Sequence, residues 1–289
     1  MVRRRPDGEA AVATADDDAL YVLTAVLLTP AQFPSVLGDD YPAACAALEI
    51  EPYAGGYGLV LGQDGVGARW TVIVDDVSLV AVAIASWDCG MEYDLSPDER
   101  SVVAALPGWP LAVASAAPGL PAPHDPHPEE GDRAALSPPE ADGWGPAQRR
   151  LGADEVALQW AAWRARMDED DSAAGAVDGV DPAGTEGGAG TETAGGPAHD
   201  PYDGVRRALG ELRGYLEDAP PVGRVRSSFA TGEARMLRAD GPGWSLVART
   251  DDMAFVLLDD EPREVLPVAR GPKLPALLEA LDAIAVRPA

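Results

Sequence analysis

A local sequence pattern occurs twice in this chain, and this repetition constrains the fold more than any other feature. The first copy is LGQDGVG at residues 61–67 and the second is LRADGPG at residues 237–243. Each is followed, at the same spacing, by an aspartate pair, at 75–76 and at 251–252. Asp-Gly between apolar runs is typical of a tight turn between two strands. The pattern therefore predicts two antiparallel meanders, arisen either by internal duplication or as two unrelated hairpins that recruit the same turn residues.

The predicted fold class is α+β, with two small lobes that each contain a mainly antiparallel meander flanked by helices. In the first lobe we expect strands at Gly58–Leu61, Trp70–Val74 and Leu79–Ile84, because these runs are rich in β-branched residues. The pair at 75–76 is then a turn between the second and third strands. Ser96-Pro97-Asp98-Glu99 has the form of a capping box, which predicts a helix to about Leu106.

The composition changes along the chain and indicates where the lobes are joined. Proline is dense between the first lobe and a helix with several tryptophans, and a stretch of Gly, Ala, Thr and acidic residues follows that helix. The predicted organisation is a disordered tail at 1–17, an N-terminal lobe at 18–117, a Pro-rich linker at 118–145, an amphipathic Trp helix at 146–168, an acidic disordered linker at 169–199 and a C-terminal lobe at 200–289.

The formal net charge of −26 excludes some classes of partner. Nucleic acids and anionic membranes are bound largely through cationic contacts, which a polyanion lacks. No apolar run approaches the roughly 20 residues that span a bilayer, and the first residues do not form a secretion signal. We therefore expect a cytoplasmic protein. Its single lysine, Lys273, and its excess of Ala, Gly, Pro and Val are typical of a GC-rich genome such as an actinobacterial one.

The Trp helix carries one apolar stripe. Val156, Trp160, Trp163 and Met167 follow one another at helical spacing and share a face. Most such stripes pack on their own fold. Because linkers flank this helix on both sides, a second interpretation is a docking helix that binds a partner's groove.

The segment 87–94 (WDCGMEYD) is the densest group of chemically capable residues. Trp87 makes it a candidate partner contact. As an alternative, Asp88, Glu92 and Asp94 are candidate ligands for a divalent cation, and Cys89 is a candidate nucleophile. No histidine or lysine lies near Cys89 in the sequence to activate it, so the structural or partner-contact interpretation is favoured.

The histidines argue against a common class of enzymes. His124 and His127 lie among prolines, and His199 ends the acidic linker. With every histidine in a predicted linker, hydrolases that need a histidine base are disfavoured. We expect no cofactor and no metal. The function predicted is therefore a non-enzymatic, chaperone-like or immunity-like adaptor that binds a protein partner, with a metal-dependent enzyme at 87–94 as the alternative.

Overall fold

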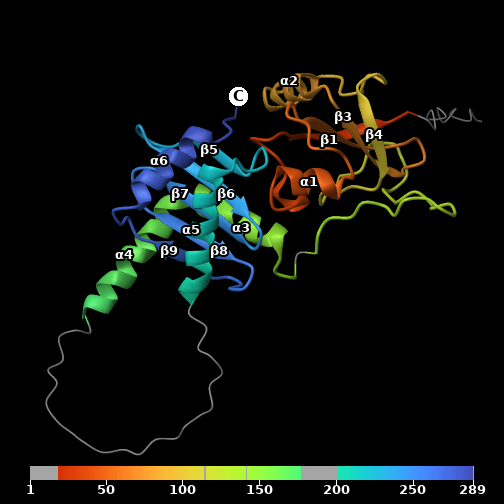
Figure 1. The fold of residues 1–289 in the computed structure, drawn as a ribbon. Coiled ribbons are helices and arrows are strands. Elements are labelled where there is room, and N and C mark those ends of the chain that lie inside the picture. Colours follow the sequence, from red (N-terminus) through yellow and green to blue (C-terminus); the bar gives the residue numbers. More distant parts are fainter. Residues whose placement is uncertain (1–18, 114, 141, 177–200, 289) are drawn as a thin grey trace, which may run out of the picture. The chain divides into compact units, whose positions relative to one another are not determined.

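The computed structural model describes residues 19–113, 115–140, 142–176 and 201–288 (Figure 1). The predicted tail at 1–17 and residues 177–199 of the predicted acidic linker lie outside the described residues. The described chain is α+β with two mainly antiparallel sheets, of four and five strands. None of its described helices is long and apolar enough to cross a membrane. The fold class predicted from the sequence is thus confirmed.

The chain divides into two compact units, which are described separately. The first unit contains the residues up to Leu27 together with Gly55–Pro138, and the second contains Leu28–Ala54 together with Pro139–Ala289. The sequence places residues 28–54 in the N-terminal lobe, whereas in the structure they belong with the C-terminal part. Ion pairs of Asp39 and Asp40 with arginines of the C-terminal part hold these residues there.

In the first unit, a four-stranded sheet is covered on one face by a helix. The strands lie in the order β1-β2-β3-β4, and α2 packs over β2. Its core contains buried valines of β2, β3 and α2, with partly buried side chains of β1 packed against them. The elements are β1 (Tyr21–Leu28), β2 (Tyr57–Gln63), β3 (Arg69–Val74), α2 (Val77–Asp88) and β4 (Val102–Pro107).

The strand expected at Leu79–Ile84 is wrong, because these residues lie within the helix α2. The helix begins after Asp76, whose carboxylate accepts hydrogen bonds from the backbone N–H of Leu79 at 3.1 Å and the hydroxyl of Ser78 at 2.7 Å. An N-cap of this kind satisfies donors that the first helical turn leaves free. The aspartate pair at 75–76 is therefore a helix start in this copy of the pattern, not a turn between strands.

The helix expected from Ser96 to Leu106 is also wrong. The carboxylates of Asp94 and Asp98 accept hydrogen bonds from the backbone two residues further on, which forms turns instead of a helical cap. The chain then enters β4, which pairs with β3 in antiparallel register. Long-range pairing with β3 thus overrides the local capping signal.

The Pro-rich segment that follows β4 is attached to the first unit. Bridges join Ala68 to His124 and Gly108 to Leu136. The buried side chain of Gln63 accepts a hydrogen bond from the backbone N–H of Ala117 at 2.7 Å. These contacts fix the path of the segment up to Pro138, although none of its described residues belongs to a helix or a named strand.

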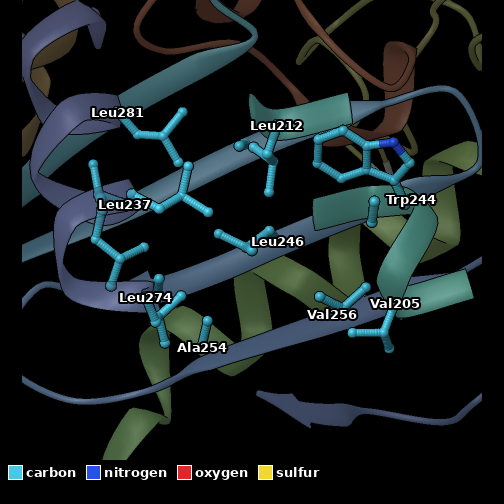
Figure 2. Close-up of a cluster of buried hydrophobic side chains, with 14 of the residues drawn as sticks. Val205, Leu212, Leu237, Trp244, Leu246, Ala254, Val256, Leu274 and Leu281 are labelled. Atoms are coloured by element: carbon cyan, nitrogen blue, oxygen red, sulfur yellow. The ribbon is translucent and has the colours of Figure 1, made fainter. Parts of the chain in front are cut away.

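In the second unit, a five-stranded sheet lies between two pairs of helices. The strands follow in chain order, β5-β6-β7-β8-β9. Leucines of α5 and α6 pack with Leu237, Trp244 and Leu246 on one face, as Figure 2 shows. The opposite face receives α3 and α4. The elements are α3 (Pro146–Leu158), α4 (Trp160–Ala176), α5 (Pro201–Glu217), β5 (Val225–Phe229), β6 (Arg235–Gly241), β7 (Trp244–Arg249), β8 (Ala254–Leu258), β9 (Leu266–Val268) and α6 (Leu274–Ile284).

The predicted Trp helix at 146–168 corresponds to two helices. α3 ends before Gln159, and α4 begins at Trp160 and continues to Ala176. The helix therefore extends eight residues into the segment predicted to be a disordered linker from 169 onward.

The segment Leu28–Ala54 is held to α3 and the sheet of the second unit by charged side chains. It contains a short helix η1 (Ser35–Leu37) and α1 (Tyr41–Ala47). Asp39 pairs with Arg149 of α3, and Asp40, which also caps α1, pairs with Arg224. Arg149 is fully buried and also binds Asp259 at 2.6 Å. These long-range pairs explain why sequence proximity to β1 does not decide where the segment packs.

The two copies of the repeated pattern both form antiparallel hairpins, β2–β3 and β6–β7. Their aspartates play different roles. Asp64 forms a turn by accepting from the backbone N–H of Val66 and Ala68, whereas Asp240 is completely buried in an ion pair. The duplication stays a prediction.

Candidate functional site

A groove on the first unit has a volume of about 760 Å³. It lies where the start of β1, the last turns of α2 and the following loop meet. The lining residues are Leu20, Tyr21, Val22, Ala83, Trp87, Gly90, Met91, Glu92, Tyr93, Asp94, Leu95 and Ser96. The groove thus includes most of the segment 87–94 that the sequence indicates.

The apolar side chains of this groove are unusually exposed. The exposed fraction is 52% for Trp87, 59% for Met91, 44% for Tyr93 and 37% for Tyr21. Scattered exposed apolar residues are ordinary, but a group that surrounds one hollow marks an interaction surface. Trp87 and its neighbours therefore form the strongest candidate site of the first unit.

The groove is held in shape by local backbone contacts. α2 ends at Asp88, and Gly90 takes a left-handed φ of 72° that reverses the chain. The N–H of Met91 then donates to the carbonyl of Ser86 at 2.8 Å, which folds the loop back on the helix. Further on, Asp94 accepts from the N–H of Ser96 at 2.9 Å.

The charge of the groove is negative. Among its described lining residues Glu92 and Asp94 are acidic and none is basic. The hydrogen bond from the backbone of Ser96, followed by the bond from its side chain, holds the pKa of Asp94 below its usual range. The carboxylate of Asp94 is therefore charged at neutral pH, and the site favours a cationic ligand.

The candidate metal ligands of the loop do not come together. In the described part of the chain, no group of three or more His, Cys, Asp or Glu side chains is placed to hold a metal ion. Asp88, Glu92 and Asp94 are exposed instead. Cys89 is exposed as well, whereas Cys45 is buried and its thiol pKa is raised, chiefly by burial.

The apolar stripe of the Trp helix packs on the sheet of the second unit. The rings of Trp160 and Trp163 meet the ring of Phe255 edge to face, with centroids 5.1 Å and 6.5 Å apart. Trp160 is 8% exposed, and Met167 packs against the same cluster. The indole N–H of Trp160 donates to Asp252 at 3.3 Å. This face is thus occupied within its own unit, and a docking role for Trp160, Trp163 and Met167 stays a prediction.

Sequence reasoning missed part of the groove. Tyr21 and Val22 of β1, together with Leu20 just before it, line the groove and lie far from Trp87 in the sequence. The sequence contains one signal for them: a β-branched strand whose partner strand follows only after a long intervening segment. The sequence does not indicate which end of which helix packs beside this strand.

His124 and His127 lie in the Pro-rich segment of the first unit, with ring centroids 6.5 Å apart. His127 lines a second, smaller hollow of about 490 Å³, which also contains Trp70 and several prolines. Among the described residues, no third His, Cys, Asp or Glu side chain joins these two histidines in a group that could hold a metal ion.

Comparisons with protein-family models, with curated proteins and with solved structures find no match for this chain.

Proposed function

We propose that this protein is a non-enzymatic binding protein whose first unit captures an extended, basic and apolar segment of a partner protein. The observation that supports this proposal best is the groove that gathers exposed Trp87, Met91 and Tyr93 beside Tyr21. Aromatic and methionine side chains are enriched where proteins bind one another. The proposal corresponds to a chaperone-like or immunity-like adaptor.

The place of β1 in its sheet supports an extended segment. β1 is the terminal strand in the order β1-β2-β3-β4 formed by the described residues. Because neighbouring side chains of a strand point to opposite faces, a groove that touches Leu20, Tyr21 and Val22 in succession reaches the backbone edge of the strand. A partner segment that adds to this edge gains main-chain hydrogen bonds, and its alternate side chains enter the groove.

The charge of the groove supports a basic segment. Glu92 and Asp94 line it, and Asp88 is exposed directly before the loop. Opposite charge on a partner increases both the rate and the specificity of association. Since the whole chain carries a net charge of −26, an acidic partner would be repelled at long range as well.

The two cysteines allow a direct test. A fluorescent dye attached to exposed Cys89 will report binding beside the groove, because buried Cys45 is protected from the reagent. The labelled protein is titrated with three peptides: one that alternates arginine and valine, one that alternates glutamate and valine, and the basic peptide with a central proline. We expect binding by the first peptide only, because the second has the wrong charge and the third cannot pair as a strand.

Variants of the groove separate this site from general charge attraction. Trp87→Ala and Met91→Ala should weaken binding of the basic peptide at least about tenfold, as expected for contact residues. Val82→Ala is the matched control, since Val82 is 51% exposed on the same helix but does not line the groove. Equal affinity for all three peptides, or an equal loss in all three variants, would contradict the proposal.

A further inference from the structure

Three arginines of the second unit are buried together, away from the groove described above. Arg226 of β5 and Arg238 of β6 are register partners in adjacent strands, and Arg150 belongs to α3, which packs on the same sheet. Their side chains are 13%, 8% and 0% exposed, respectively. Burial of three like charges in one place requires compensation by other groups.

The same edge of each guanidinium group has no hydrogen-bond partner. The Nε and Nη2 atoms of Arg150, Arg226 and Arg238 are sealed from solvent and donate to no acceptor among the described residues. Nη2 of Arg226 lies 3.6 Å from a carboxylate oxygen of Asp240, which is beyond hydrogen-bond distance. Nε–H and Nη2–H point in one direction and form the fork that binds two oxygens of a carboxylate or phosphate at once.

The Nη1 atoms, in contrast, are used. Nη1 of Arg150 donates to the carboxylate of Asp240 and to the backbone carbonyl of Asp39. Nη1 of Arg238 donates to the carboxylate of Asp154. Arg150 and Arg238 are therefore anchored through Nη1, and their Nε and Nη2 atoms are available to a further acceptor.

The carboxylates nearby are unevenly shared. Arg149 pairs with two of them, Asp39 and Asp259. The other three arginines share two, Asp154 and Asp240, so the four arginines together face four carboxylates. Burial and then the charge of Arg150 lower the pKa of Arg226 to about 9.

We propose that Arg150, Arg226 and Arg238 form a binding site for a small oxyanion, of the chemical class of phosphate, sulfate or carboxylate. The ring of Phe33 covers this site: its centroid lies 4.1 Å from the guanidinium carbon of Arg150 and 4.8 Å from that of Arg226. Because the open edges are sealed from solvent, the anion enters when Phe33 and the irregular residues around it move aside.

The test uses the full chain with inorganic phosphate, sulfate and acetate at constant ionic strength, the remainder being chloride. We expect the melting temperature of the second unit to rise with the concentration of at least one of these anions and to saturate. Saturation by phosphate and sulfate alone would identify a tetrahedral anion as the ligand, and saturation by acetate alone a carboxylate. A rise that is linear in all three, without saturation, is a general salt effect and would overturn the proposal.

Arg226→Gln removes one fork and should weaken the binding of the anion at least about tenfold. Arg213→Gln, at an exposed arginine of α5, is the matched control and should bind as the unaltered protein does. If Arg226→Gln does not fold, the unaltered protein decides the question alone. In the presence of this protein, the phosphorus-31 resonance of added phosphate should broaden, and it should sharpen again when sulfate displaces the phosphate. Absence of broadening, together with absence of a saturable effect of acetate on the melting temperature, would refute the site.

Discussion

Arg150 and Asp240 form an ion pair in which neither side chain is exposed to solvent. Asp240 also accepts from the hydroxyl of Ser245 at 2.8 Å. Removing one member of a buried pair leaves the other charge without compensation, which costs about 3–5 kcal/mol. We predict that Asp240→Ala destabilises the second unit by that amount, measured by urea unfolding and by hydrogen exchange of the β6 and β7 amides.

The control for this prediction is an exposed pair in the same unit. Arg206 and Asp203 of α5 lie one helical turn apart and are 60% and 65% exposed. Surface pairs of this kind contribute roughly 0–1 kcal/mol. Asp203→Ala should therefore change the unfolding free energy far less than Asp240→Ala, and equal effects would show that burial does not govern the Arg150 pair.

The stability of the second unit should depend on pH through Asp39. Burial, which outweighs the lowering effect of Arg149, raises the pKa of Asp39 to about 6, above a value of about 3.9 in an unfolded chain. Between about pH 4 and pH 6 the folded state therefore binds this proton more tightly than the unfolded state does. The contribution of Asp39 to the unfolding free energy rises as pH falls through this window and is lost above it.

Asp39→Asn isolates this contribution, because asparagine does not titrate. The difference in unfolding free energy, unaltered protein minus variant, should decrease from about pH 4 to pH 6 and be constant above. A difference that increases over the same range would mean that the ion pair with Arg149 dominates and that the pKa of Asp39 is lowered instead.

The sequence predicts the fold well where local and long-range signals agree. In the second unit the repeated pattern forms the expected hairpin of β6 and β7, although Asp240 and Gly241 end β6 and the turn itself is Pro242-Gly243. Buried and charged residues alternate along β6. Leu237 faces α5 and α6, while Arg238 and Asp240 face α3. Sequence periodicity alone indicates this alternation.

Prediction fails where the decisive interaction is not local. The run from Val77 to Ile84 has the β-branched content of a strand. It forms a helix because Asp76 caps its first turn and the helix packs on β2. The groove combines β1 with the end of that helix, so mistaking the helix for a strand also conceals the groove. The buried arginines were missed for a related reason: a charged residue in a strand is normally taken to face solvent, and the covering segment 28–54 is remote in sequence.

Trp160 should contribute to stability through its contact with Phe255. It is 8% exposed and its ring lies edge to face with that of Phe255. Replacing a buried tryptophan by alanine costs about 3–5 kcal/mol. We predict a loss of about 3 kcal/mol for Trp160→Ala, measured by urea unfolding. Leu158→Ala is the control, since Leu158 is 82% exposed, and it should change the free energy by no more than about 0.5 kcal/mol.

The attachment of the Pro-rich segment can be tested at two glycines with the same backbone. Gly108 and Gly119 both have a φ of 82°, so alanine introduces similar backbone strain at each. A Cβ at Gly108 would lie 2.3 Å from the carbonyl oxygen of Leu136, whereas one at Gly119 would meet nothing within 4 Å.

We predict that Gly108→Ala destabilises the first unit by at least about 1 kcal/mol more than Gly119→Ala. The clash must push the segment around Leu136 away from β4 and break the hydrogen bond from the N–H of Leu136 to the carbonyl of Pro107, which is 2.7 Å long. Limited proteolysis should then cut the segment near Leu136 faster in Gly108→Ala than in Gly119→Ala. Equal cleavage rates would show that the contact at Gly108 does not hold this segment.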